Sequence, residues 1–283
     1  MYAKPALLTL SIALAAVLCG CAGSPRARAS ADHGARIVTL MPSFAEDLCA
    51  IGADREIVGV SQYGASASCA PGAPQVGNFA SIDAEKIVAL HPDVVVGIPA
   101  QRTLTAPLAR AGIATAFLRD ESYTDIFADV RELGALSGKR AQAAQLAAAM
   151  QKRTEALQAS EHFSRRPSVF VVLQAQPIWT VGPQSYISTL LRLAGGRNAV
   201  TRLPRAYAQY SAEALIRLQP DAIVTGSDTQ LRALLTREPW RSLRAVRENH
   251  VFVIPDPGLL ERPGPHYNEG LSWLIERLRP IAK

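Results

Sequence analysis

The sequence lacks the motifs that mark several classes of enzyme. It contains no G-x-S-x-G, no P-loop and no G-x-G-x-x-G, so acyl transfer, nucleotide hydrolysis and dinucleotide chemistry lack their usual parts. Histidines are few and scattered, and no two have the spacing of metal ligands (His33, His91, His162, His250 and His266). The net charge of +6 comes from dispersed side chains, without the basic runs of a nucleic-acid-binding face. We therefore expect no catalytic residues, no protein-bound metal and no nucleic-acid partner.

Long apolar runs are also missing, apart from one near the N-terminus. Residues 6–18 form an apolar-to-neutral run of thirteen residues behind Lys4, which is too short to span a bilayer and is typical of an export signal. The following Leu18-Cys19-Gly20-Cys21 resembles a lipoprotein cleavage box. We expect a signal peptide over residues 1–20, acylation of Cys21, and a flexible tether over residues 21–35. A soluble exported protein, cut nearby, is the alternative.

What the chain does contain is an internal repeat. Residues 83–96 (DAEKIVALHPDVVV) recur 128 positions later as residues 211–224 (SAEALIRLQPDAIV), with six of fourteen positions identical. Each copy begins with a good N-cap residue, continues with apolar residues at helical spacing, stops at a proline, and ends in an apolar run typical of a buried parallel strand. The two copies are too far apart for a solenoid and predict two similar α/β lobes, over residues 36–138 and 166–283.

One long helical stretch separates the two copies. Residues 140–162 include AQAAQLAAAM and contain neither glycine nor proline, which predicts the longest helix of the chain. At about 1.5 Å per residue such a helix crosses a whole lobe, so we expect residues 139–165 to connect the lobes. Elsewhere we expect a single strand over residues 176–181 and loops over residues 61–78, 201–209 and 256–265.

Four phrases together resemble a known family. They are RIVTLMPSFAEDLCAIGA at residues 36–53, VGNFASIDAEKIVALHPDVVVG at 76–97, YSAEALIRLQPDAIV at 210–224, and the ending VFVIPD…ERPGPHYNEGLSWL at 251–274. Their order is similar to that of the substrate-binding proteins of ABC importers for metal chelates, which carry cobalamin, haem or iron–siderophore complexes. The resemblance covers the whole body and implies an α/β fold with two Rossmann-like lobes, a single long backbone helix, and a ligand cleft between the lobes. It also implies a monomer in the periplasm or cell envelope.

The resemblance gives a role to two matched glutamates. Glu85 and Glu213 occupy the same position in the first turn of the two repeated helices. In the family, glutamates at these positions pair with arginines on the two permease subunits, so the implied partners are a permease dimer and its ATPase subunits. The alternative is that each carboxylate only stabilises the start of its helix.

The ligand is expected to contact scarce aromatic side chains. Aromatics make up 6% of the chain, and the cobalamin-binding relatives have cleft aromatics at positions that match Tyr63, Phe79, Trp179 and Tyr207 here. Ile98 replaces a further aromatic of that set, and Arg262 matches a cleft arginine that hydrogen-bonds amides or carboxylates. The resemblance is therefore closest to corrinoid binders, with no resident cofactor. Haem remains an alternative, with a tyrosinate ligand from Tyr63 or Tyr207, and so does a ferric siderophore. For each aromatic, a place in a lobe core is the structural alternative.

Two cysteines fall in the body of the chain. In an oxidising periplasm Cys49 and Cys69 form a plausible disulfide, and two buried free thiols are the alternative.

Two other functional classes fit the sequence less well. A two-lobed hydrolase lacks a recognisable pair of catalytic acids, and a lipoprotein sensor or adhesin would not need both Glu85 and Glu213.

Overall fold

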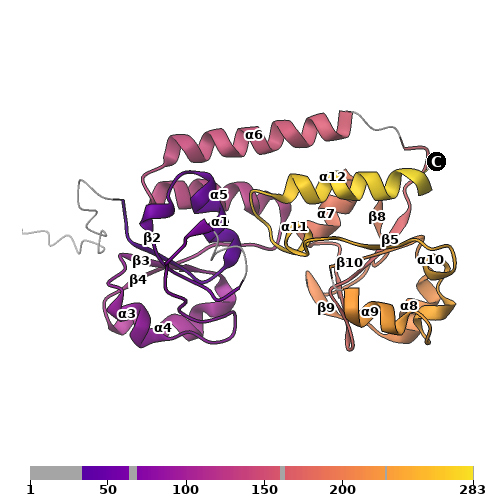
Figure 1. The fold of residues 1–283 in the computed structure, drawn as a ribbon, viewed down its shortest axis with the longest axis horizontal. Helices are drawn as coiled ribbons and strands as arrows, with labels where there is room; N and C mark the ends of the chain where they lie inside the picture. The colour runs from indigo at the N-terminus through magenta and orange to yellow at the C-terminus, as the bar shows by residue number, and fades with distance from the viewer. Residues whose placement is uncertain (1–33, 64–68, 160–162, 227, 283) are drawn as a thin grey trace, which may run out of the picture.

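The computed structural model describes residues 34–63, 69–159, 163–226 and 228–282. The expected signal peptide and the acylation site Cys21 lie outside the described residues, as does nearly all of the expected tether. Figure 1 shows the described chain as two α/β lobes side by side, with one long helix running across both. Short strands that are buried on both faces lie at the centre of each lobe.

The N-terminal lobe is built on a parallel sheet with the strand order β2-β1-β3-β4. Its central strand β3 is fully buried, as the apolar run after the repeated proline predicted. The strands are β1 (Ile37–Thr39), β2 (Ile57–Val60), β3 (Val94–Gly97) and β4 (Ala114–Phe117). The helices are α1 (Pro42–Ala50), α3 (Ala84–Ala89), α4 (Arg102–Arg110) and α5 (Tyr123–Leu136).

The C-terminal lobe repeats this arrangement with a parallel sheet in the order β11-β10-β5-β8. Its strands are β5 (Ser168–Val172), β8 (Arg197–Asn198), β10 (Ala222–Thr225) and β11 (Val251–Val253). Its helices are α7 (Tyr186–Leu193), α8 (Ala212–Leu218), α9 (Asp228–Leu234), α10 (Arg244–Arg247), α11 (Gly258–Glu261) and α12 (Tyr267–Leu278). The short helix α11 lies where residues 256–265 were expected to form a loop.

A small antiparallel sheet in the C-terminal lobe was not predicted. It has the order β6-β7-β9, from Gln174–Ala175, Ile178–Val181 and Tyr207–Gln209. The expected single strand over 176–181 is confirmed from residue 178 onward, but Pro177 lies in the turn between β6 and β7, where its missing N–H costs no ladder bond. The expected loop over 201–209 is wrong at its end, where Tyr207–Gln209 pairs with a strand distant in sequence.

The connecting helix α6 spans Arg140–Ala159, and residues 160–162 of the expected helix lie outside the described residues. A second helix reinforces it, since α12 packs on α6 (Figure 1). The Tyr267 hydroxyl lies 2.7 Å from Thr154 Oγ1 of α6 and 3.1 Å from the Tyr123 hydroxyl of α5. Asn268 Nδ2 donates to the Met150 carbonyl over 2.9 Å. The C-terminal helix is therefore bonded to both the connecting helix and the N-terminal lobe.

The repeated L-x-P-D phrase has the same structural role in both lobes. Asp93 accepts a hydrogen bond from the backbone N–H of Arg36 (2.7 Å), just before β1, and Asp221 accepts one from Ser168 (2.7 Å), the first residue of β5. The residue before each proline has a left-handed backbone, with φ of 46° at His91 and 44° at Gln219. Each aspartate thus holds the end of a repeated helix against the start of the neighbouring strand.

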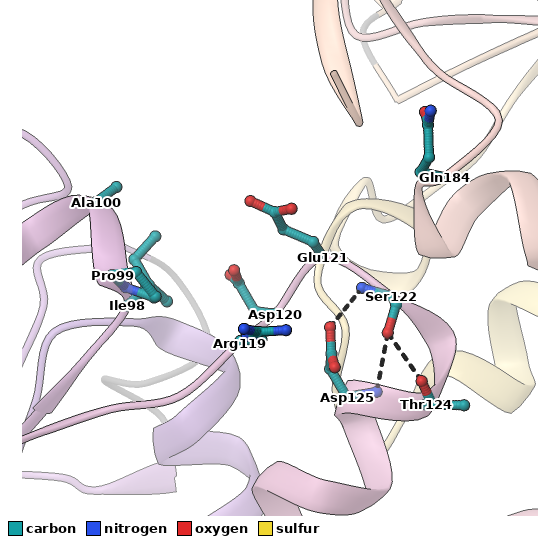
Figure 2. A pocket seen from close by; sticks show the side chains of 10 residues that line it. All are labelled: Ile98, Pro99, Ala100, Arg119, Asp120, Glu121, Ser122, Thr124, Asp125 and Gln184. Carbon is teal, nitrogen blue, oxygen red and sulfur yellow. Dashed lines mark hydrogen bonds between the residues drawn. The ribbon is translucent and has the colours of Figure 1, made fainter. Parts of the chain in front are cut away.

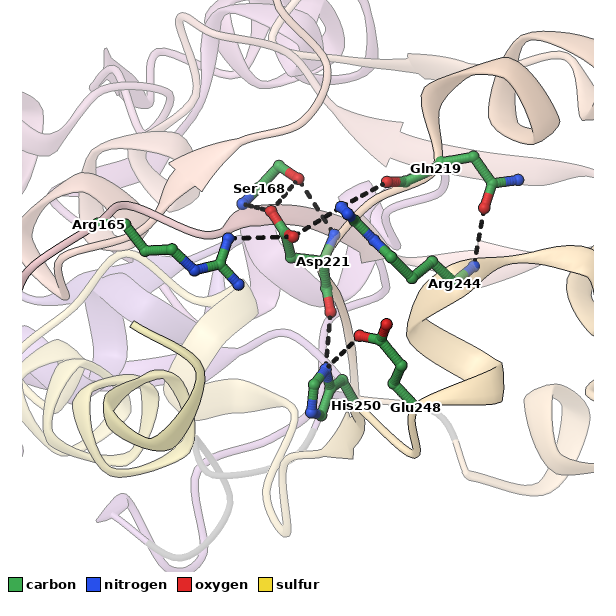
Figure 3. Close-up of polar contacts among 7 residues, drawn as sticks. All are labelled: Arg165, Ser168, Gln219, Asp221, Arg244, Glu248 and His250. Atoms are coloured by element: carbon green, nitrogen blue, oxygen red, sulfur yellow. Dashed lines mark hydrogen bonds and ion pairs between the residues drawn. The ribbon is translucent and has the colours of Figure 1, made fainter. Parts of the chain in front are cut away.

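The C-terminal copy carries a larger network (Figure 3). The Asp221 carboxylate also accepts from Ser168 Oγ (2.7 Å) and pairs with Arg165 (3.2 Å) and Arg244 (2.6 Å). Burial raises the pKa of Asp221, but the hydrogen bonds from Ser168 and Arg165 and the charge of Arg244 outweigh it, so the net pKa is lowered. Gln219 Oε1 accepts a further hydrogen bond from the backbone N–H of Arg244 (2.9 Å).

Candidate functional site

A cavity of about 590 Å³ opens between the two lobes. One side is formed by Ile98, Pro99 and Ala100, which follow the carboxyl end of β3, and the opposite side includes Gln184 of the C-terminal lobe (Figure 2). Its base is the segment that follows β4 and enters α5, with Arg119, Asp120, Glu121, Ser122, Thr124 and Asp125. A cleft at the carboxyl ends of parallel strands is where open α/β sheets bind ligands.

The base of this cleft carries three carboxylates, Asp120, Glu121 and Asp125, against one cation, Arg119, and is therefore acidic. The side chains of Asp120 and Glu121 point into the open space in Figure 2, whereas Asp125 turns back to the helix start. Ser122 N–H donates to Asp125 Oδ2 (2.8 Å), and Asp125 N–H donates to Ser122 Oγ (3.3 Å), which fixes the first turn of α5. Burial, with smaller contributions from neighbouring carboxylates, raises the pKa of Asp120 to about 6. The cleft therefore favours ligand groups that donate hydrogen bonds or carry positive charge.

Two of the predicted aromatics lie on one face of the antiparallel sheet. Val181 is paired with Tyr207, and Trp179 with Gln209, so Trp179 and Tyr207 are diagonal neighbours with their side chains on the same face. Both are half-buried. Burial raises the pKa of Tyr207. The negative charges of Asp120 and Glu121, in the cleft base, raise it further.

Of the three predicted contacts in the N-terminal lobe, only Ile98, which is buried, lines the cavity. Gln101 bonds to two of these residues, because its Oε1 accepts from Ile98 N–H (3.1 Å) and its Nε2 donates weakly to the Phe79 carbonyl (3.5 Å). Phe79 and Tyr63 are 52% and 51% exposed, so neither is a core residue. Neither belongs to the lining of the cavity, and Tyr63 follows the carboxyl end of β2.

A disulfide closes the loop that carries Tyr63. Cys49, in α1, and Cys69 are joined in the structure with their Cα atoms 6.2 Å apart. Cys69, six residues after Tyr63, is thereby tied to the first helix of the lobe.

Arg262 is engaged within the protein rather than free in the cleft. Its Nε lies 3.0 Å from Glu46 Oε1 without hydrogen-bond geometry, and its Nη2 lies 3.7 Å from Asp256. Burial raises the pKa of Glu46, and the nearby Arg262 charge offsets part of that rise. Since Glu46 belongs to α1 and Arg262 follows α11, this ion pair joins the two lobes, and Arg262 does not line the cavity of Figure 2.

The two repeated glutamates are exposed on matched helices. Asp83 caps α3 by accepting from Lys86 N–H, and Ser211 caps α8 by accepting from Ala214 N–H, which confirms both predicted N-caps. Glu85 and Glu213 stand in the first turns of these helices, and both side chains are exposed. In Figure 1, α3 and α8 lie on the same side of the molecule, opposite α6.

Sequence reasoning missed the residues that give the cleft its charge, Asp120 and Glu121, and the C-terminal lobe residue Gln184. One observation could have found the acids, since Asp120 and Glu121 follow the end of strand β4 within four residues. Among the described residues, no group of three or more His, Cys, Asp or Glu side chains is arranged to hold a metal ion. In the same part of the chain, no helix has both the length and the apolar character needed to cross a membrane.

Two parallel-sheet lobes with a lined cleft between them define a ligand-binding protein of the two-lobed α/β class. The chain belongs to the periplasmic binding protein family, whose pattern matches residues 37–257. An uncharacterized ABC transporter substrate-binding lipoprotein of Bacillus subtilis (strain 168) is 28% identical over 254 residues, covering 87% of this chain and 80% of that protein.

Solved structures show the same fold. The periplasmic vitamin B12 binding protein of Vibrio cholerae superposes with a TM-score of 0.76 at 25% identity, covering 88% of this chain and 98% of that one. A periplasmic heme binding protein from Pseudomonas aeruginosa superposes equally well, with a TM-score of 0.76 at 26% identity over 88% and 94% of the chains. The predicted fold class and family are confirmed, and these similarities do not separate a corrinoid from haem.

Proposed function

We propose that this protein is the substrate-binding component of an ABC importer and that it captures a corrinoid such as cobalamin in the cleft between its lobes. The observation that carries the choice of ligand is the acidic cleft base formed by Asp120 and Glu121. A corrinoid presents carboxamide N–H groups that hydrogen-bond to carboxylates, and a broad apolar face that suits Trp179 and Tyr207. The vitamin B12 binding relative supports the same ligand class.

Haem is the second candidate because a heme binding protein is equally similar in fold. Its propionates, like the anionic groups of many ferric siderophores, would face the carboxylates of the cleft base, and like charges repel. Arg262, the cationic side chain expected to receive such groups, is paired with Glu46. These observations favour the neutral, amide-rich ligand.

The test is direct comparison of ligands. We expect cyanocobalamin to quench the intrinsic tryptophan fluorescence of the protein and to bind at least tenfold more tightly than haemin or a ferric catecholate. The double variant Asp120→Asn, Glu121→Gln should lose about tenfold in cyanocobalamin affinity and gain relative affinity for haemin. Glu155→Gln, an exposed acid on α6, is the matched control and should change neither. Preferential haemin binding by the wild type would refute the corrinoid assignment.

We further propose that Glu85 and Glu213 dock on the two subunits of the permease dimer, which in turn binds its ATPase subunits. Their exposure and their matched helices on one side of the molecule support this role. Glu85→Ala and Glu213→Ala should leave cyanocobalamin affinity within about twofold of the wild type and abolish uptake. Loss of ligand binding in solution by either variant would show that the glutamate serves the ligand site instead.

The remaining parts of the proposal concern the mature chain. We propose a monomer with no resident cofactor, held at the cell envelope by acylation of Cys21. The lipoprotein relative from Bacillus subtilis supports the anchor. Labelling with radioactive palmitate should be lost in Cys21→Ser, and the protein should then be released as a soluble monomer. Retained label would place the acylation elsewhere.

A further inference from the structure

Exposed large apolar side chains are rare on this protein, and two of them are related by the internal repeat. Among the described residues they are Tyr63, Phe79, Val88 and Ile216. The first two are predicted ligand contacts. Val88 and Ile216 lie on α3 and α8 and are 128 positions apart, which is the period of the repeat. Their exposures are also matched, at 38% and 39%. A single exposed apolar residue needs no explanation, but a matched pair does.

Helix geometry sets each of these side chains beside a glutamate. Val88 follows Glu85 by three residues, and Ile216 follows Glu213 by three, so each pair shares one flank of its helix. The opposite flank of each helix is anchored in its lobe by a fully buried residue, Ile87 in α3 and Leu215 in α8. Both helices therefore present the same two-part surface, a carboxylate with an apolar side chain next to it.

We infer that Val88 and Ile216 form the apolar half of the permease-docking surface. The inference rests on the proposed docking role of Glu85 and Glu213. An ion pair between solvent-exposed side chains contributes little to affinity by itself. An apolar contact beside it removes water from the pair, which strengthens the electrostatic attraction and adds the burial of apolar area. The partner then has to present, once on each subunit, a cationic side chain next to an apolar depression.

Charge argues against the two other occupants of this surface. A second copy of this chain, bound through the same faces, would bring carboxylate against carboxylate, because each helix carries a glutamate at the matched position. An anionic lipid surface is not complementary either, because each helix carries only one basic residue, Lys86 in α3 and Arg217 in α8, to offset its glutamate. A permease dimer with basic groups is the partner whose charge complements both helices.

Site-specific photocrosslinking tests the contact without requiring any ligand. The photoreactive residue p-benzoylphenylalanine is introduced in place of Val88, Ile216 or, as control, Gln151, which is exposed on α6 at the opposite side of the molecule. In irradiated cells we expect positions 88 and 216 to form adducts with an ABC permease subunit, identified by mass spectrometry, and position 151 to form none. Adducts only between two copies of this chain, or equal permease adducts from position 151, would overturn the inference.

Serine variants measure how much the apolar contact contributes. Val88→Ser and Ile216→Ser together should reduce cyanocobalamin uptake at least tenfold, with the melting temperature and the affinity for cyanocobalamin unchanged. Ala148→Ser, an exposed change on α6 at the opposite side of the molecule, should transport normally. Normal uptake by the serine variants, with uptake lost in Glu85→Ala and Glu213→Ala, would overturn this inference alone. Normal uptake by the glutamate variants would remove the docking proposal and this inference with it.

Discussion

The matched aspartates Asp93 and Asp221 allow a stability prediction in which each lobe is the control for the other. The change is Asp→Ala at each site. Asp221 has a side chain only 8% exposed and accepts hydrogen bonds from Ser168 N–H and Oγ, both at 2.7 Å. Asp93 is only partly buried and accepts a hydrogen bond from the backbone N–H of Arg36 at 2.7 Å.

The magnitude follows from the bonds that are lost. A hydrogen bond to a charged group contributes about 1.5–3 kcal/mol, and a buried donor left unsatisfied costs about 1–3 kcal/mol. Asp221→Ala removes two such bonds within a buried site, while Arg165 and Arg244, partly exposed, turn to solvent, so we expect a loss of roughly 3–5 kcal/mol. Asp93→Ala should cost only about 1–2 kcal/mol, because one bond is lost at a wetter site.

Urea denaturation followed by circular dichroism at pH 7 measures both variants. The pH dependence gives a second check on Asp221, whose pKa is lowered in the folded state. Its stabilisation is fully present above the unfolded-state pKa and is lost as the pH falls through the folded-state pKa, so wild type and Asp221→Ala should converge in acid. Equal costs for the two variants, or a larger cost at Asp93, would contradict the reasoning from the bond networks.

Three further predictions concern a buried acid, the disulfide and the ligand aromatics. Burial raises the pKa of Asp129 to about 8, so between about pH 4 and pH 8 the folded protein holds a proton that the unfolded chain has lost. The free energy of unfolding should therefore fall as the pH rises from 5 to 8. Melting curves of Asp129→Asn should show a weaker dependence on pH. Replacing Cys49 and Cys69 by serine should lower the free energy of unfolding by roughly 3 kcal/mol, and reduction of the wild type should lower it by the same amount. No change in either case would mean that the disulfide restricts the unfolded chain little. Trp179→Ala and Tyr207→Ala should each weaken cyanocobalamin binding at least tenfold by titration, and unchanged affinity in both would move the ligand site elsewhere.

The parts of the fold that depend on local sequence could be predicted. The repeated N-cap, helix, proline and apolar run predicted α3–β3 and α8–β10, because each of these signals acts within a few residues. The family resemblance then predicted the two lobes and the connecting helix. The apolar flank at Val88 and Ile216 was visible as matched apolar positions, but only the structure shows these side chains to be exposed.

The parts that depend on distant partners could not be predicted. Tyr207–Gln209 becomes a strand only because β7 lies beside it, and a tyrosine, an alanine and a glutamine give no local pattern for a strand. Likewise, nothing near Arg262 in the sequence indicates that Glu46 holds it. Arg262 was expected to contact the ligand, and in the structure it forms an ion pair between the lobes.

The position of α12 makes the packing of the N-terminal lobe depend on a distant part of the chain. Tyr267 makes edge-to-face contacts with Tyr123 (5.4 Å between ring centroids) and Phe127 (6.1 Å), both in α5 of the N-terminal lobe. The aromatic cluster of this lobe is thus completed by a residue 144 positions after Tyr123. Because α12 also packs on α7 of the C-terminal lobe, we expect the two lobes to unfold together rather than one after the other.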